Sequence, residues 1–167
     1  SGDRTGRILE GELARGQDFK NHYESSKFWA EVEVQRHMAS LPITIFRPSI
    51  VVGDSRTGRI VKYDGPYYIF RLIDRLPSWF PLLNIGAGDA FVNLVPVDFV
   101  SEAMAHLGTH SEHDGKVFHL ADPSPMKARD VLQLVSTAFD RQGAIASLPA
   151  PMIERFLARS KTTRELL

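Results

Sequence analysis

The 167-residue sequence contains no cysteine, which excludes disulfides, thiolate metal ligands and a cysteine nucleophile. It has no excess of either charge, because 20 lysine and arginine residues balance 20 aspartate and glutamate residues. Binding of nucleic acid or of an anionic membrane through net charge is therefore not expected. No uninterrupted apolar run is long enough to cross a bilayer. The lack of cysteine suits a reducing compartment, so we expect a globular cytoplasmic protein.

The N-terminal segment is polar and interrupted by glycines, which is not typical of a signal peptide. The sequence has no initiating Met and begins in a loop-like stretch. We therefore expect it to be a part of a longer protein.

Helical and strand-like patterns alternate along the chain. Asn21 is a suitable N-cap, with Glu24 three residues later, for a helix that ends near Ser40. Asp98 is expected to be the N-cap of a later helix. The further expected elements are strands over 43–53, 91–97 and 116–121 and helices over 66–76, 99–107, 127–139 and 151–160. This order predicts a single α/β domain over residues 1–167 with a mainly parallel sheet.

The stretch "YESSK" places Tyr23 and Lys27 four residues apart at the beginning of the first expected helix. Residues at this spacing share one helix face. A phenol has an unperturbed pKa of about 10, and a nearby ammonium lowers the pKa of a phenol. Such a phenol can exchange a proton with a carbonyl oxygen or an alcohol. A Tyr-x-x-x-Lys spacing also occurs by chance on solvated helix faces, so its surroundings must decide between the two interpretations.

Those surroundings are a helix followed at once by a strand that ends in "RPSIVVGD", and later "NLVPVDFVSEAMAHL" and "KVFHLADPSP". Together these segments resemble the extended branch of the short-chain dehydrogenase/reductase superfamily. "YESSKFWAE" with "RPSIVVGDSRTG" is most similar to thioester reductases and fatty acyl-CoA reductases within that branch. The resemblance implies the C-terminal part of a Rossmann-like doubly wound parallel sheet with a small substrate-binding subdomain.

The resemblance also implies roles for individual residues. Tyr23 would be the proton donor or acceptor, and Lys27 would hold the ribose hydroxyls of a nicotinamide cofactor. The segment beside the nicotinamide ring would consist of Pro48, Ser49, Ile50 and Val51. NADP is expected as the cofactor of a reductive enzyme, although NAD stays open. The helix over 21–40 could also pair across a homodimer, as in relatives.

Two parts that the family carries have no match here. The first is the Gly-rich phosphate loop, for which Gly86-Ala87-Gly88 is only a G-x-G that leads towards a strand and is interpreted as a turn. The second is the catalytic Ser or Thr before the tyrosine, a role that we do not assign to Ser1. The expected protein is thus the C-terminal portion of a reductase, inactive alone, without its first nucleotide-binding half.

Three functions stay open on the sequence. The first is hydride transfer to an acyl thioester or an apolar carbonyl. The second is a sugar-nucleotide epimerase or dehydratase, and the third is a non-catalytic nucleotide sensor that keeps the fold. The retained Tyr23 and Lys27 argue against the third, and the few basic residues in the aromatic stretch argue against the second.

Two further groups of residues could bind a ligand, namely three histidines and an aromatic stretch. His106, His110 and His113 are interpreted as solvated histidines at a helix end, and no metal is expected. The aromatic stretch over 62–83 could equally line an apolar acyl channel or fill a core. On the first helix, Phe28, Trp29 and Val32 are expected to face the core, and Tyr23, Lys27, Ala30 and Val34 to form a second face.

Overall fold

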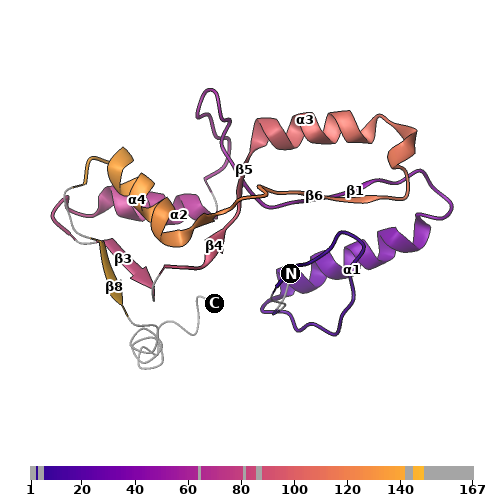
Figure 1. The fold of residues 1–167 in the computed structure, drawn as a ribbon, viewed down its shortest axis with the longest axis horizontal. Coiled ribbons are helices and arrows are strands. Elements are labelled where there is room, and N and C mark those ends of the chain that lie inside the picture. Colours follow the sequence, from indigo (N-terminus) through magenta and orange to yellow (C-terminus); the bar gives the residue numbers. More distant parts are fainter. Residues whose placement is uncertain are drawn as a thin grey trace. The chain divides into compact units, whose positions relative to one another are not determined.

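The computed structural model describes residues 3, 6–63, 65–80, 82–85, 88–141 and 145–148. It divides into two compact units (Figure 1). The first unit comprises Ser1–Gly58 and Val95–Ala121, and the second comprises Arg59–Leu94 and Asp122–Leu167. The expected helix over 151–160 and the first two residues of the Gly86-Ala87-Gly88 turn lie outside the described residues.

The first unit is built around a pair of parallel strands. Strand β1 (Ile45–Pro48) pairs with β6 (Val117–Leu120), so that Phe46 lies opposite Phe118 and Arg47 lies opposite His119. Its other elements are α1 (His22–His37), β2 (Ile50–Val52), β5 (Leu94–Pro96), α3 (Val97–Gly108) and the short 3₁₀ helix η1 (Ser111–His113).

The expected strand over 43–53 is interrupted in the structure. Strand β1 pairs with β6, whereas β2 pairs with β5. Between them, the backbone N–H of Ser49 donates to the carbonyl of Leu120 at 3.0 Å. The prediction of one continuous strand was therefore wrong, because the chain changes its pairing partner at Ser49.

The two faces of the β1–β6 pair differ in chemistry because side chains alternate along a strand. On one face, α3 packs through a buried cluster of Val95, Val100 and Leu120, against which Phe46 and Phe118 pack. On the other face lie the polar residues Arg47 and His119, and Arg47 is bonded to α1. Figure 1 shows α3 and α1 on opposite sides of this strand pair.

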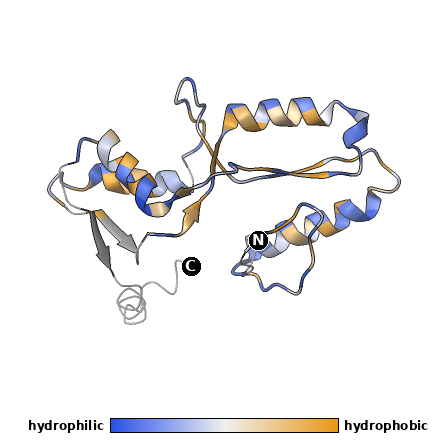
Figure 2. Ribbon diagram, viewed as in Figure 1, coloured by the Kyte–Doolittle hydropathy of each residue, from blue (hydrophilic) through white to orange (hydrophobic). Residues whose placement is uncertain are grey.

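Helix α1 begins as the capping signals predict. Asn21 is the N-cap, and its side-chain oxygen accepts from the Glu24 backbone N–H at 2.9 Å. Glu24 in turn accepts from the backbone N–H of Lys20 at 3.2 Å. None of its residues is fully buried, and Figure 2 shows mostly hydrophilic residues along it.

The prediction for the inner face of α1 was wrong for one residue. Phe28 and Val32 are half-buried, and the Phe28 ring lies 4.9 Å from that of Phe19. Trp29, however, is 59% exposed. It follows Phe28 directly, and one residue rotates the side chain by about 100° around a helix, away from the inner face.

Within its described residues, the second unit contains two further strand pairs and two helices. Strands β3 (Leu82–Ile85) and β8 (Ile145–Leu148) are parallel, and β4 (Phe91–Val92) is antiparallel to β7 (Met126–Lys127). The helices are α2 (Pro66–Arg75) and α4 (Ala128–Ala138), close to the predicted bounds. Strands β3, β7 and β8 were not predicted.

A polar residue also divides the expected strand over 91–97. Asn93 separates β4 from β5, and its amide nitrogen donates to the carbonyl of Asp122 at 2.8 Å. The amide oxygen of Asn93 accepts from the Asp122 N–H at 3.0 Å. The Asn93 side chain thus bonds to the Asp122 backbone where β4 ends and β5 has not yet begun.

Candidate active site

Tyr23 and Lys27 share one face of α1, as their spacing predicts. The Lys27 ammonium nitrogen lies 5.7 Å from the centroid of the Tyr23 ring. Both side chains are exposed, and Tyr23 is 69% accessible. The phenol is therefore open to a ligand and has an ammonium group beside it.

The segment Pro48–Val51 begins at the carboxyl end of β1, whose last residue is Pro48, and continues into the first two residues of β2. Pro48 is exposed, and the side chains of Ile50 and Val51 are 44% and 39% exposed. Ser49 is half-buried between them. Ligands of parallel α/β sheets bind at the carboxyl ends of strands, so these open apolar side chains are suitably placed to contact a planar ring.

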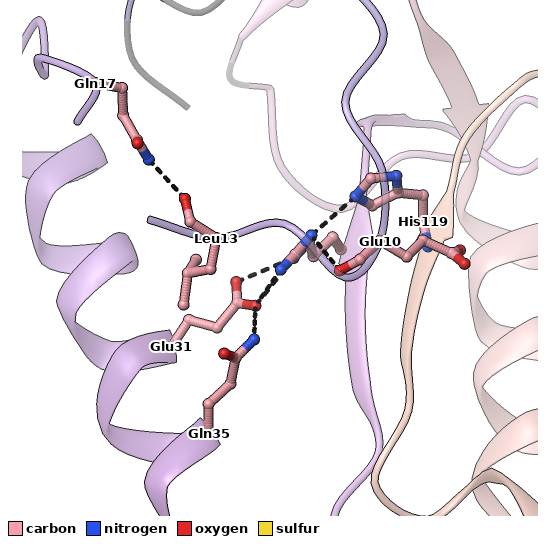
Figure 3. Close-up of polar contacts among 7 residues, drawn as sticks. Glu10, Leu13, Gln17, Glu31, Gln35 and His119 are labelled. Carbon is pink, nitrogen blue, oxygen red and sulfur yellow. Dashed lines mark hydrogen bonds and ion pairs between the residues drawn. The ribbon is translucent and has the colours of Figure 1, made fainter. Parts of the chain in front are cut away.

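A polar network connects α1 to β1 (Figure 3). The Arg47 guanidinium donates to the Glu31 carboxylate from Nε at 3.0 Å and from Nη2 at 2.6 Å. Its Nη1 contacts the backbone carbonyl of Glu10 and Nε2 of His119, each at 3.1 Å. Sequence reasoning named Arg47 as part of a motif but missed Glu31 and His119. An arginine early in an apolar strand requires an acidic partner, and that signal could have pointed to Glu31.

His119 has a lowered pKa in this network. Partial burial is the main cause, and the positive charge of Arg47 adds to it. Because a guanidinium can only donate, Nε2 of His119 accepts and the ring proton resides on Nδ1.

The loop after β2 is organised by two carboxylates. Asp54 accepts from the backbone N–H and the hydroxyl of Thr57, each at 2.8 Å, which holds the pKa of Asp54 below its usual value. Asp98 accepts from the Ser55 hydroxyl at 2.7 Å and from the Ser55 backbone N–H at 2.9 Å. These bonds from Ser55 are the main reason why the pKa of Asp98 is lowered.

The prediction that Asp98 caps α3 was wrong. The helix begins at Val97 and its N-cap is Pro96, which makes no side-chain capping bond. Pro96 has extended backbone angles and ends β5, and the helix starts two residues earlier than expected. Asp98 lies in the first turn, where negative charge is favourable, and its carboxylate binds Ser55.

Two of the three histidines, His110 and His113, contact carbonyls at the end of α3 through ring nitrogens. Nδ1 of His110 lies 2.6 Å from the carbonyl of His106, and Nδ1 of His113 lies 2.8 Å from that of Leu107. Carbonyls in the last turn of a helix have no partner within it, so these contacts satisfy them. Within the part of the chain that the structure describes, no group of three potential ligands is placed to hold a metal ion.

The aromatic stretch of the second unit is largely open to solvent. Tyr63, Tyr68 and Trp79 are 54%, 67% and 74% exposed, and Ile69 and Leu72 of α2 are similarly exposed. Tyr67 is half-buried, and its ring meets the Phe70 ring edge-on at 5.6 Å between centroids. Core packing therefore accounts for only part of this stretch.

Among the described residues, no helix is both long enough and apolar enough to span a membrane.

The parallel strand pairs, their covering helices and the Tyr–Lys helix define a Rossmann-like domain of the extended short-chain dehydrogenase/reductase type. The chain belongs to the male sterility protein family, NAD_binding_4, whose model matches residues 2–104. The resemblance seen in the sequence is thus confirmed, as is the α/β fold class.

The chain is homologous to reductases of biosynthetic enzymes. It is 28% identical to the nonribosomal peptide synthetase FrzA of Cladobotryum over 85% of this chain and 14% of that protein. It is 29% identical to a carboxylic acid reductase of Mycobacterium tuberculosis over 63% of this chain and 10% of that protein. The chain therefore spans about a tenth to a seventh of the length of these curated relatives.

A solved structure shows the same relationship. The terminal R domain of the myxalamid PKS-NRPS biosynthetic pathway matches with a TM-score of 0.74 and 29% identity, over 93% of this chain and 38% of that one. The sugar-nucleotide epimerase and dehydratase structures that also match are 17–20% identical, so they share the fold alone. The comparisons thus favour the reductase interpretation over the sugar-nucleotide alternative.

Proposed function

We propose that the chain forms part of an NADPH-dependent reductase that transfers hydride to an acyl thioester or another apolar carbonyl. The observation that carries this proposal is the Tyr23–Lys27 arrangement, with an ammonium 5.7 Å from the centroid of an exposed phenol ring. The reductase relatives support the reaction class.

The residues of the site suit a nicotinamide cofactor. The Lys27 ammonium, with its three donors, would bind the ribose hydroxyls. The exposed side chains of Pro48, Ile50 and Val51, with Ser49 between them, would lie against the nicotinamide ring. When bound, the cofactor supplies hydride to the carbonyl carbon.

Tyr23 would supply the proton that this reduction requires. As hydride reaches the carbonyl carbon, negative charge develops on the carbonyl oxygen, and the phenol gives its proton to that oxygen. The Lys27 ammonium stabilises the phenolate that remains. The chain covers 14% of FrzA and 38% of the solved R domain, so the activity is proposed for the whole enzyme of which these residues would be a part.

The substitution Tyr23→Phe tests the proposal because it removes the phenolic oxygen and little else. Here and in the kinetic tests below, activity is measured on the full-length enzyme, because we expect the chain to be inactive alone. We expect thioester reductase activity with NADPH to fall by about 10²- to 10⁴-fold, the usual contribution of a general acid. Tyr68→Phe is the matched control, since Tyr68 is exposed to the same degree, 67% against 69%. Full activity of Tyr23→Phe would overturn the proposal.

A further inference from the structure

Helix α1 is held in place by polar contacts to an unusual extent. None of its residues is fully buried, so apolar packing alone fixes its position only loosely. The side chains of Glu31 and Arg47, by contrast, are only 17% and 19% exposed. The guanidinium binds the carboxylate through two nitrogens, a geometry that defines both distance and orientation.

The surrounding contacts restrict this pair further. Arg47 also donates to the Glu10 carbonyl and contacts His119 on the neighbouring strand. The Glu31 carboxylate also accepts a bond from the Gln35 amide at 3.2 Å. Figure 3 shows these side chains converging between α1 and the strands. A shift of α1 would therefore break several of these bonds at once.

The position of this pair along the chain gives it a role in the candidate site. Glu31 is one helical turn after Lys27, and Arg47 directly precedes Pro48. We propose that Glu31 and Arg47 are positioning residues, which set the Tyr23–Lys27 face of α1 relative to the segment Pro48–Val51. This inference rests on the proposed function, because it concerns the geometry of the same site.

A second ion pair on the same helix provides a matched comparison. Glu33 and Arg36 are 2.7 Å apart, but their side chains are 59% and 66% exposed and both belong to α1. This pair connects no two elements, so its loss would leave the position of α1 unchanged. Exposed pairs of this kind also contribute little to stability.

The test is a double-mutant cycle on reductase activity, with NADPH and an acyl thioester as substrates. We expect Glu31→Gln and Arg47→Met each to lower kcat/KM by about 10- to 100-fold, the effect of a displaced site. Because they break the same bridge, the double variant should be no worse than either single variant. Arg47→Lys should also have a lowered kcat/KM. An ammonium lacks the planar arrangement of donors with which a guanidinium binds a carboxylate through two nitrogens. Glu33→Gln and Arg36→Met should be unchanged.

The Michaelis constants separate positioning from a merely structural role. With far-UV circular dichroism showing all variants folded, Glu31→Gln should raise KM for NADPH as well as lower kcat. Tyr23→Phe should mainly lower kcat. If Glu31→Gln fails to fold, Gln35→Leu, which removes only one bond to Glu31, should show the same raised KM in milder form.

The outcomes distinguish this inference from the proposed function. Additive effects in the double variant, or unchanged kinetics of folded Glu31→Gln, would overturn the positioning role while leaving Tyr23 as the acid. Unimpaired Tyr23→Phe would instead remove the proposed function itself, whatever Glu31→Gln does.

Discussion

Lys27 places its ammonium nitrogen 5.7 Å from the centroid of the Tyr23 ring, on the exposed face of α1. A cation–π contact at an exposed site contributes only about 0.5–1 kcal/mol. The contact therefore has a minor part in holding the fold together. Its value lies in bringing a positive charge to a phenol that a ligand can reach.

The Lys27→Met variant should lose this charge without losing the fold. We expect kcat/KM for NADPH to fall by at least about 100-fold, because the residue would both bind the ribose and stabilise the phenolate. The free energy of unfolding should change by less than about 0.5 kcal/mol, as for other exposed positions. Steady-state kinetics and urea denaturation measure the two quantities. Lys20→Met, at an exposed lysine just before α1, is the control and should retain activity.

The beginning of α1 depends on the Asn21 side chain. Its oxygen accepts from the Glu24 backbone N–H, which has no partner within the helix. Asn21→Ala should therefore lower the free energy of unfolding by about 1 kcal/mol, whereas Asn21→Asp, which keeps the acceptor, should have little effect. Equal stabilities of the two variants in urea denaturation would contradict the capping role.

A pH titration that measures the pKa of Asp98 should reveal the bonds from Ser55 to its carboxylate. Its pKa is lowered below the ordinary value of 3.8, mainly by the Ser55 hydroxyl. A lowered carboxyl pKa adds stability above the unfolded-state pKa, and this stability is lost as the pH falls through the folded-state value. Ser55→Ala should move the pKa of Asp98 upwards, as measured by NMR of the carboxyl carbon.

The neighbouring carboxylate supplies the control for that titration. Thr57→Ala removes the hydroxyl that is the main cause of the lowered pKa of Asp54. It should raise the pKa of Asp54 and leave that of Asp98 nearly unchanged. A pKa of Asp98 that is insensitive to Ser55→Ala would show that the hydroxyl bond is absent in solution.

Local signals in the sequence predicted the helices better than the strands. Asn21 and Glu24 predicted the beginning of α1, and the bounds expected for α2 and α4 were close to those observed. The expected strands over 43–53 and 91–97 each proved to be two strands, because the chain changes pairing partner at Ser49 and Asn93. Strand partners lie far away along the chain, so no local pattern encodes where one pairing ends and the next begins.

In the candidate site, too, the local features were predicted and the contacts between residues far apart along the chain were not. The shared face of Tyr23 and Lys27 follows from a spacing of four residues on a helix. The partners of Arg47 do not, since Glu31 is 16 residues away and His119 is 72 residues away along the chain. The fold alone brings these three together, and sequence reasoning consequently missed the network.

His119 provides a direct test of that network in solution. Its pKa is lowered from 6.5, first by partial burial and then by the charge of Arg47. A lowered histidine pKa means that the unfolded state binds the proton more readily. Stability is therefore complete above the unfolded-state pKa, falls as the pH drops below about 6.5, and levels off below the folded-state value.

Substitution of Arg47 should weaken this pH dependence by raising the pKa of His119. Arg47→Met removes a positive charge and leaves the Glu31 carboxylate, which favours protonation of His119, so the pKa of His119 should rise. In the unsubstituted protein, ¹⁵N NMR should show the proton of neutral His119 on Nδ1, because Nε2 accepts from Arg47. Glu33→Gln, which alters only the exposed pair, should change neither result. A neutral ring protonated on Nε2, or a pKa of His119 unaffected by Arg47→Met, would mean that Arg47 does not contact His119, and the network would then lack its link to β6.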